Sequence, residues 1–249
     1  MTIKLSILMD IDQVIIKRNP LAYLINDIAK RVSKDTGISK EDFLKEIRRE
    51  RLARIASKDY VRAYDYQDII EKIYLKYGLK EKPPQLAIML KNYLVEKYLH
   101  VYPDAIDTIK RLKKLPVALI AFSSGYSIYQ VPLLRKLNLL EYFDKIATPD
   151  LLGYGKPDRR AYEKALKNMP SKALAVGDSY FFDVYGAKNA GLPVVLVVRE
   201  NVLNLEKFLR KKYLNEKCSL KVDFPFYKPD YVIFNMTKLL DIVKTLLLV

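Results

Sequence analysis

The feature that most constrains the fold is a short apolar run that ends abruptly in two carboxylates. Residues 4–9 read Lys-Leu-Ser-Ile-Leu-Met, and Asp10 and Asp12 follow with one residue between them. A run of this length is typical of a buried parallel strand. Open α/β sheets bind their ligands at the carboxyl ends of such strands. The two aspartates therefore either cap a turn, as this residue often does, or share a hard cation such as Mg²⁺.

Composition excludes several classes of protein. With 249 residues, half of them hydrophobic, the chain can bury a full core, as one α/β domain with a smaller insert. Cys218 is the only cysteine, which excludes an intramolecular disulfide framework and favours a reducing, cytoplasmic compartment. His100 is the only histidine, which excludes histidine-rich metal sites. We expect no secretory leader, because Lys4 and Asp10 interrupt the first apolar run, and no membrane span.

The net charge is strongly positive. Lys and Arg number 44 against 29 Asp and Glu, which gives +15 at pH 7. This excess would attract any polyanion, including nucleic acid. Nucleic acid is not expected as the main partner, because no recognition motif or long basic block accompanies the charge. The same charge suits a protein that handles small phosphorylated substrates.

After Ile16 the apolar residues change from the spacing of a strand to that of helices. The predicted helices run from about 21 to Gly37, from the capping box at Ser39 to about Ser57, over 65–77 and over 82–99. Because no strand pattern interrupts residues 17–100, we predict that they form a helical domain inserted into a core made of residues 1–16 and 101–249. Its hinges should lie near 16–19 and 100–103.

The remainder of the chain alternates strands and helices. Strands are predicted over 117–122, 145–148, 173–176, 194–198 and 231–234, and helices over 103–114, from 125 to about 137 and from Pro157 onward. Residues 217–229 are expected to be irregular. Together with the first strand, this pattern predicts an α/β fold, a doubly wound sheet of six parallel strands.

Three of the predicted strands end in polar side chains that suit one site. Asp10 and Asp12, Ser123 and Asp178 each follow a strand, and the carboxyl ends of parallel strands share one edge of the sheet. Lys156 is predicted to begin a helix on that side. A fourth carboxyl candidate, Asp183, lies five residues beyond Asp178, where its side chain can turn back to the same cation.

With these residues the whole chain resembles the haloacid dehalogenase superfamily, in its Mg²⁺-dependent phosphatase branch. The motifs, in the family's order, are Asp10-Ile11-Asp12-Gln13-Val14, then Ser123 followed by Gly125, then Gly155-Lys156-Pro157-Asp158, and finally Gly177-Asp178-Ser179 with Asp183. Each motif is weak alone, but the four together are specific. The helical insert resembles the family's C1 cap, which closes over the site and selects the substrate.

The resemblance implies a role for each motif. Asp10 would attack phosphorus and form an aspartyl-phosphate, while Asp12 would protonate the leaving oxygen and later deprotonate water. The implied Mg²⁺ ligands are Asp10, Asp12 through its backbone carbonyl, Asp178 and Asp183. Ser123, Ser124, Gly125 and Lys156 would hold the phosphoryl oxygens.

Asp12 also points to the branch of the superfamily. Members that cleave carbon–halogen bonds lack this second acid, so its presence implies phosphate-ester chemistry. Two residues depart from the family's pattern: Gln13 replaces a glycine and Ser124 replaces an asparagine. Neither departure removes a group that the reaction requires, so we expect both to affect substrate fit and rate and not the type of reaction.

The predicted function is hydrolysis of a small phosphorylated metabolite, with two alternatives left open. A phosphomutase would use the same residues and return the phosphoryl group to the product. A non-catalytic polyanion-binding protein would keep the fold and use the +15 charge. The residues of the cap and of the motif loops that could meet the substrate are Lys17, Arg18, Arg48, Arg49, Arg51, Arg54, Tyr126, Tyr180 and Phe181. Neither the substrate nor the oligomeric state can be predicted.

Overall fold

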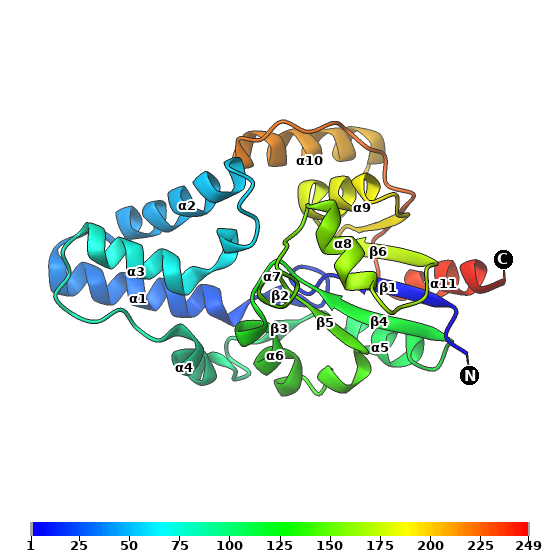
Figure 1. Cartoon of the computed structure of the whole chain (residues 1–249), viewed down its shortest axis with the longest axis horizontal. Helices are drawn as coiled ribbons and strands as arrows, with labels where there is room; N and C mark the ends of the chain where they lie inside the picture. The colour runs from blue at the N-terminus through cyan, green and yellow to red at the C-terminus, as the bar shows by residue number, and fades with distance from the viewer. Residues whose placement is uncertain (1, 249) are drawn as a thin grey trace.

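The computed structural model describes residues 2–248, and its centre is a parallel sheet (Figure 1). In these residues the sheet has six strands in the order β5-β4-β1-β6-β7-β8. The strands are β1 (Leu5–Met9), β4 (Val117–Phe122), β5 (Lys145–Ala147), β6 (Ala173–Gly177), β7 (Val194–Val197) and β8 (Tyr231–Ile233). The order reverses direction at β1, so the predicted doubly wound sheet is confirmed and its switch point lies beside Asp10.

Register brings the ends of three strands together. Met9 of β1 pairs with Ala121 of β4 on one side and with Val176 of β6 on the other. All three strands are buried along their length, as expected for apolar strands covered on both faces. The residues that follow these strands therefore start from adjacent points on the same edge.

Helices cover both faces of the sheet. Leu5, Ile7 and Met9 face a cluster that contains residues of the first group of helices, whereas Leu8 faces a cluster that contains residues of the second group. The first group comprises α5 (Pro103–Leu112), α6 (Ser127–Lys136) and α11 (Lys238–Leu248). The second comprises α8 (Arg159–Leu166), the π-helical turn η4 (Tyr180–Tyr185), α9 (Gly186–Asn189) and α10 (Leu205–Leu220), while the short α7 (Pro149–Leu152) follows β5.

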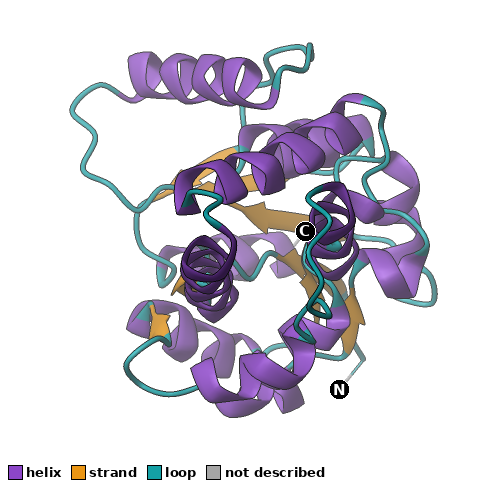
Figure 2. Cartoon of the chain, turned by 90° about the vertical axis from the view of Figure 1, so that its left-hand side faces the viewer, coloured by secondary structure: helices purple, strands orange, loops and turns teal. Residues whose placement is uncertain are grey.

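The inserted cap is helical and projects from the carboxyl edge of the sheet (Figure 1). Its elements are α1 (Pro20–Thr36), α2 (Lys40–Ala56), η1 (Arg62–Tyr64), α3 (Tyr66–Lys76), α4 (Leu86–Leu90) and η2 (Lys91–Tyr93). Viewed from the cap side, the sheet lies behind these helices (Figure 2). The chain enters and leaves through β2 (Ile16–Arg18) and β3 (His100–Val101), which pair antiparallel.

The first two cap helices begin where their capping residues predict. Asn19 accepts a hydrogen bond from the N–H of Leu21, and Ser39 accepts one from the N–H of Asp42. Gly37, with φ of 75°, ends α1 in the left-handed conformation that glycine adopts without strain.

Aromatic rings join the cap to the core. Tyr60 lies with its ring centroid 6.2 Å from that of Phe181, and Tyr64 lies 5.7 Å from Phe182, both in edge-to-face geometry. A side chain at Gly155 would place its Cβ 2.5 Å from the carbonyl oxygen of Tyr60. The cap backbone therefore packs directly on the core loop that carries the lysine motif.

Three predicted element boundaries are wrong. The helix predicted over 82–99 is reduced to α4 and η2, which together end at Tyr93. Pro157 does not begin α8, since Asp158 caps that helix by accepting from the N–H of Arg160. Residues 217–220 belong to α10 and the irregular segment starts at Lys221, a left-handed residue with φ of 55°.

None of the helices within residues 2–248 is both long and apolar enough to span a membrane.

Candidate active site at the carboxyl edge of the sheet

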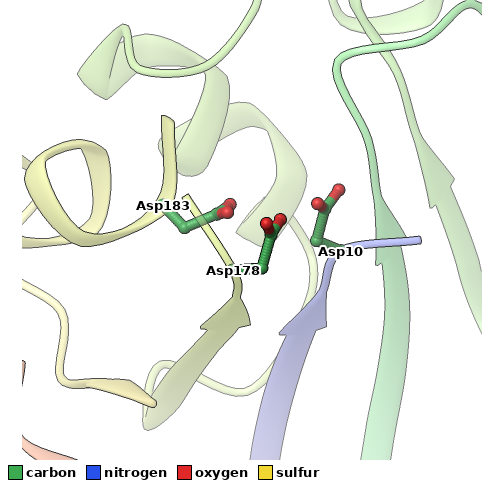
Figure 3. Close-up of side chains that lie close together, drawn as sticks. All are labelled: Asp10, Asp178 and Asp183. Atoms are coloured by element: carbon green, nitrogen blue, oxygen red, sulfur yellow. The ribbon is translucent and has the colours of Figure 1, made fainter. Parts of the chain in front are cut away.

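Three carboxylates meet beyond the ends of β1 and β6 (Figure 3). Asp10 follows β1, Asp178 follows β6, and Asp183 reaches back from η4. One oxygen of each lies within 4.8 Å of an oxygen of the other two. Asp10 and Asp183 are buried, with 8% and 4% of their surface exposed. The strand register therefore produces the acidic cluster that the sequence predicts.

Lys156 is the cation of this cluster. Its Nζ lies 3.0 Å from Oδ1 of Asp10 and 2.7 Å from Oδ1 of Asp183. It is 3% exposed. Because both partners are also buried, these ion pairs are weakly screened by solvent. The prediction that Lys156 begins a helix is wrong, because α8 starts at Arg159. Lys156 does lie at the predicted edge of the sheet.

The cluster has three carboxylates and one cation, and the pKa values of Asp10 and Asp178 are raised. Burial raises the pKa of Asp10 well above its usual value, although Lys156 opposes the rise. Burial and the neighbouring Asp183 raise the pKa of Asp178 to about 7. Burial alone would lower the pKa of Lys156, but Asp10 and Asp183 outweigh it and raise that pKa. The cluster thus favours additional positive charge.

Two amide side chains hold the carboxylate of Asp12 in place beside the cluster. Its Oδ1 accepts a hydrogen bond from Nδ2 of Asn19 at 2.9 Å, and its Oδ2 accepts one from Nε2 of Gln130 at 3.0 Å. Burial raises the pKa of Asp12, while the two amide donors act against the rise. The predicted participation of its backbone carbonyl in metal binding stays a prediction.

Ser123 is tied to Asp12 through Gln130. The Nε2 of Gln130 also donates to Oγ of Ser123 at 3.1 Å, and the same Oγ accepts from the N–H of Gly125 at 3.0 Å. A Cβ at Gly125 would lie 2.6 Å from Nε2 of Gln130, so the amide occupies space that only glycine leaves open. Ser123, Ser124 and Gly125 line a pocket that they share with the aspartates, and their binding of phosphoryl oxygens stays a prediction.

Gln13, the first departure from the family's pattern, occupies a left-handed position. Its φ is 60°, which explains why glycine is usual there. The Gln13 side chain donates to the carbonyl oxygen of Lys17 at 2.7 Å, so it binds the entrance strand of the cap. Within residues 2–248, Gln13 does not line the pocket that lies over the aspartates.

Glu216 of α10 fixes the turn between Asp178 and Asp183. Its Oε1 accepts from the N–H of Tyr180 at 2.8 Å, and its Oε2 accepts from Oγ of Ser179 at 2.6 Å and from the N–H of Phe181 at 2.9 Å. The N–H of Ser179 in turn donates to Asp183 at 3.0 Å. One carboxylate from a distant helix therefore orders the acidic loop.

A pocket of about 490 Å³ opens over these groups and extends beneath the cap. Its aromatic lining comes from Tyr64, Tyr66, Tyr129 and Phe182. The side chains named above as ones that could meet the substrate do not line it in the described part of the chain: Tyr126, Tyr180, Phe181, Lys17, Arg18, Arg48, Arg49, Arg51 and Arg54.

Sequence reasoning missed three residues of this region. Asn19 was readable as a helix cap next to Pro20, but its second bond to Asp12 was not. Gln130 and Glu216 lie on helices far along the chain from the groups they bind. No local pattern in the sequence marks either of them.

Comparison with known proteins gives one family. Residues 6–191 match the family model described as hydrolase, haloacid dehalogenase-like hydrolase. The chain is 33% identical over 126 residues to a glyceraldehyde 3-phosphate phosphatase from Methanothermobacter thermautotrophicus, covering 49% of this chain and 56% of the relative. It is 29% identical to a protein of the same name from Pyrococcus furiosus, covering 73% of this chain and 69% of that one.

A solved structure agrees over nearly the full length. A HAD phosphatase from Thermococcus onnurineus superposes with a TM-score of 0.69 at 28% sequence identity, covering 98% of both chains. A known fold therefore corresponds to nearly the whole of this chain, including its sheet, its helical cap and the site at the carboxyl edge.

Proposed function

This chain belongs to the haloacid dehalogenase-like hydrolases, and we propose that it hydrolyses the phosphate monoester of a small metabolite through an aspartyl-phosphate on Asp10. The predicted phosphatase function is borne out by the three similar proteins reported above, each of which carries a phosphatase name. One observation carries the mechanism: Asp10, Asp178, Asp183 and Lys156 converge in a buried pocket, with Asp12 beside them.

The donor set fits Mg²⁺. Four carboxylates line the pocket against a single amine, and three of them offer oxygens within 4.8 Å of one another. Hard oxygen donors of this kind suit Mg²⁺. We propose that Asp10, Asp178 and Asp183 hold the ion together with the backbone carbonyl of Asp12. When bound, Mg²⁺ would offset the negative charge of the carboxylates and of the phosphoryl group.

Each side chain of the site has its own role in the proposed reaction. A carboxylate oxygen of Asp10 attacks phosphorus, and the bond from phosphorus to the leaving oxygen breaks. Asp12 gives its proton to that oxygen and later takes one from the water that hydrolyses the aspartyl-phosphate. Asn19 and Gln130 orient Asp12 for both steps. Ser123 and Lys156 bind the phosphoryl oxygens, with Ser124 and Gly125 completing the cradle.

We also propose that residues 17–100 act as the cap and that residues 1–16 and 101–249 form the core. The paired strands β2 and β3 would be the hinge, because all chain connections between the two parts pass through them. Closure would exclude bulk water from the pocket. The single cysteine, Cys218, fits a cytoplasmic location.

The test is release of inorganic phosphate from an aryl phosphate, with and without Mg²⁺, by the native chain and by Asp10→Asn. We expect metal-dependent turnover that the substitution abolishes. Glyceraldehyde 3-phosphate is the first metabolite to assay, because the relatives bear its name. Phosphate release that survives Asp10→Asn would refute the mechanism, and isomerisation in excess of hydrolysis would indicate a mutase.

A further inference from the structure

The pocket has two chemically different ends. The inner end carries the aspartates and Lys156, whereas the outer end is made of hydrocarbon and phenol rings. The cap residues of that outer end are Leu21, Ile25, Leu44, Ile47, Tyr64 and Tyr66. They come from α1, α2, η1 and α3, so four of the six helical elements described for the cap present an uncharged side chain to the pocket.

The charges of the pocket are all at the inner end. Among the described residues that line it, Lys156 is the one cation. Its Nζ is already paired with Asp10 at 3.0 Å and with Asp183 at 2.7 Å. A substrate that carried a second anionic group would find no unpaired cation at the outer end.

The arginines of the cap are engaged elsewhere. Arg54 is 6% exposed, donates to the carbonyl oxygen of Arg62 at 2.8 Å and forms an ion pair with Asp68. Arg51 lies over the ring of Tyr64, 5.4 Å from its centroid, and does not line the pocket. Arg54, which is buried, and Arg51, which is half-buried, therefore pack within the cap and do not line the pocket.

We infer that the substrate of this site is a phosphate monoester whose leaving group is uncharged and presents hydrocarbon to the cap. The inference rests on the proposed function and specifies its substrate class. A carboxylate or second phosphate on the leaving group would be buried without a partner, which is strongly unfavourable. The apolar wall instead favours each methylene that contacts it. The leaving group of glyceraldehyde 3-phosphate meets the charge condition.

The experiment compares two esters of the same length. One is n-butyl phosphate, and the other is the phosphate ester of 4-hydroxybutanoate, which ends in a carboxylate instead of a methyl group. We expect kcat/KM for the butyl ester to exceed that for the carboxylate by about 100-fold or more, since an unpaired buried charge is so costly. The hydrolysis counted is the part that Asp10→Asn abolishes.

A matched pair of variants locates the effect in the pocket. Leu44→Arg places a cation on the half-buried pocket face of α2, and it should reduce the preference for the butyl ester by about 10-fold, because it gives the carboxylate a partner. Leu75→Arg adds the same charge to α3 at a side chain that is 82% exposed, and it should leave the preference unchanged.

The outcomes separate the two claims. Equal, Asp10-dependent hydrolysis of both esters by the native chain overturns the inferred substrate class and leaves the proposed phosphatase intact. Absence of Asp10-dependent hydrolysis with either ester and with an aryl phosphate overturns the proposed function, and the inferred class with it. Because the two esters are compared on the native chain, the inference stays testable if Leu44→Arg does not fold.

Discussion

Replacement of Glu216 by alanine should destabilise the chain more than its position on a surface helix suggests. The carboxylate accepts hydrogen bonds from the backbone N–H groups of Tyr180 and Phe181 and from the hydroxyl of Ser179. Each partly buried donor left without an acceptor costs about 1–3 kcal/mol. Because the three donors share one turn, the losses overlap, and we expect a total of about 3–5 kcal/mol.

The measurement is urea unfolding followed by circular dichroism, together with thermal unfolding. For a chain of this size, each kcal/mol shifts Tm by about 2–4 °C, so Glu216→Ala should lower Tm by about 6–20 °C. Glu216→Gln keeps one acceptor oxygen and should fall between. Glu206→Ala is the control, because Glu206 lies on the same helix and makes only a 3.4 Å surface contact with Arg210. A Glu216→Ala protein within about 0.5 kcal/mol of the native chain would refute the reasoning.

Three further predictions concern the site. Gly177→Ala would place a Cβ 2.0 Å from Cγ of Asp183, so the carboxylate must move and Mg²⁺ affinity, measured by calorimetry, should fall at least about 10-fold; unchanged affinity would contradict this packing. Gln130→Leu removes one of the two amide hydrogen bonds that orient Asp12 and should reduce kcat by about 10- to 100-fold; an unchanged kcat would show that Gln130 does not position Asp12. Mg²⁺ at about 100 times its Kd should stabilise the chain by about 2.7 kcal/mol in a thermal-shift assay, reversed by chelator; no shift would argue against a metal at the acidic cluster.

The spacing of apolar residues along the sequence predicted most of the strands and the polar residues that follow them. The strand at residues 5–9, the polar residues after it, and Ser123 and Asp178 were readable because parallel strands are short apolar runs whose ends must meet at one edge. The family, fold class and phosphatase function predicted from the four motifs are confirmed. The roles of the individual site residues and the domain boundaries stay predictions.

Tertiary contacts decided what the sequence could not predict. Residues 94–99 have apolar spacing suited to a helix, yet Tyr93 donates its hydroxyl to Asp27 of α1 at 2.9 Å and the chain turns there instead. Gln130 and Glu216 act across 118 and 37 residues of sequence. A side chain whose partner lies that far along the chain leaves no periodic signal, since periodicity reports only which face of an element is buried.

The aromatic contacts between cap and core have a thermal consequence. If the cap separates from the core, the rings of Tyr60 and Phe181, and of Tyr64 and Phe182, lose their contact and become hydrated. Hydration of apolar surface raises the heat capacity. The enthalpy of opening must therefore grow with temperature, and a turnover limited by opening would follow a curved Eyring plot. The curvature of that plot, measured well below the unfolding temperature, would report how much apolar surface is hydrated when the cap opens.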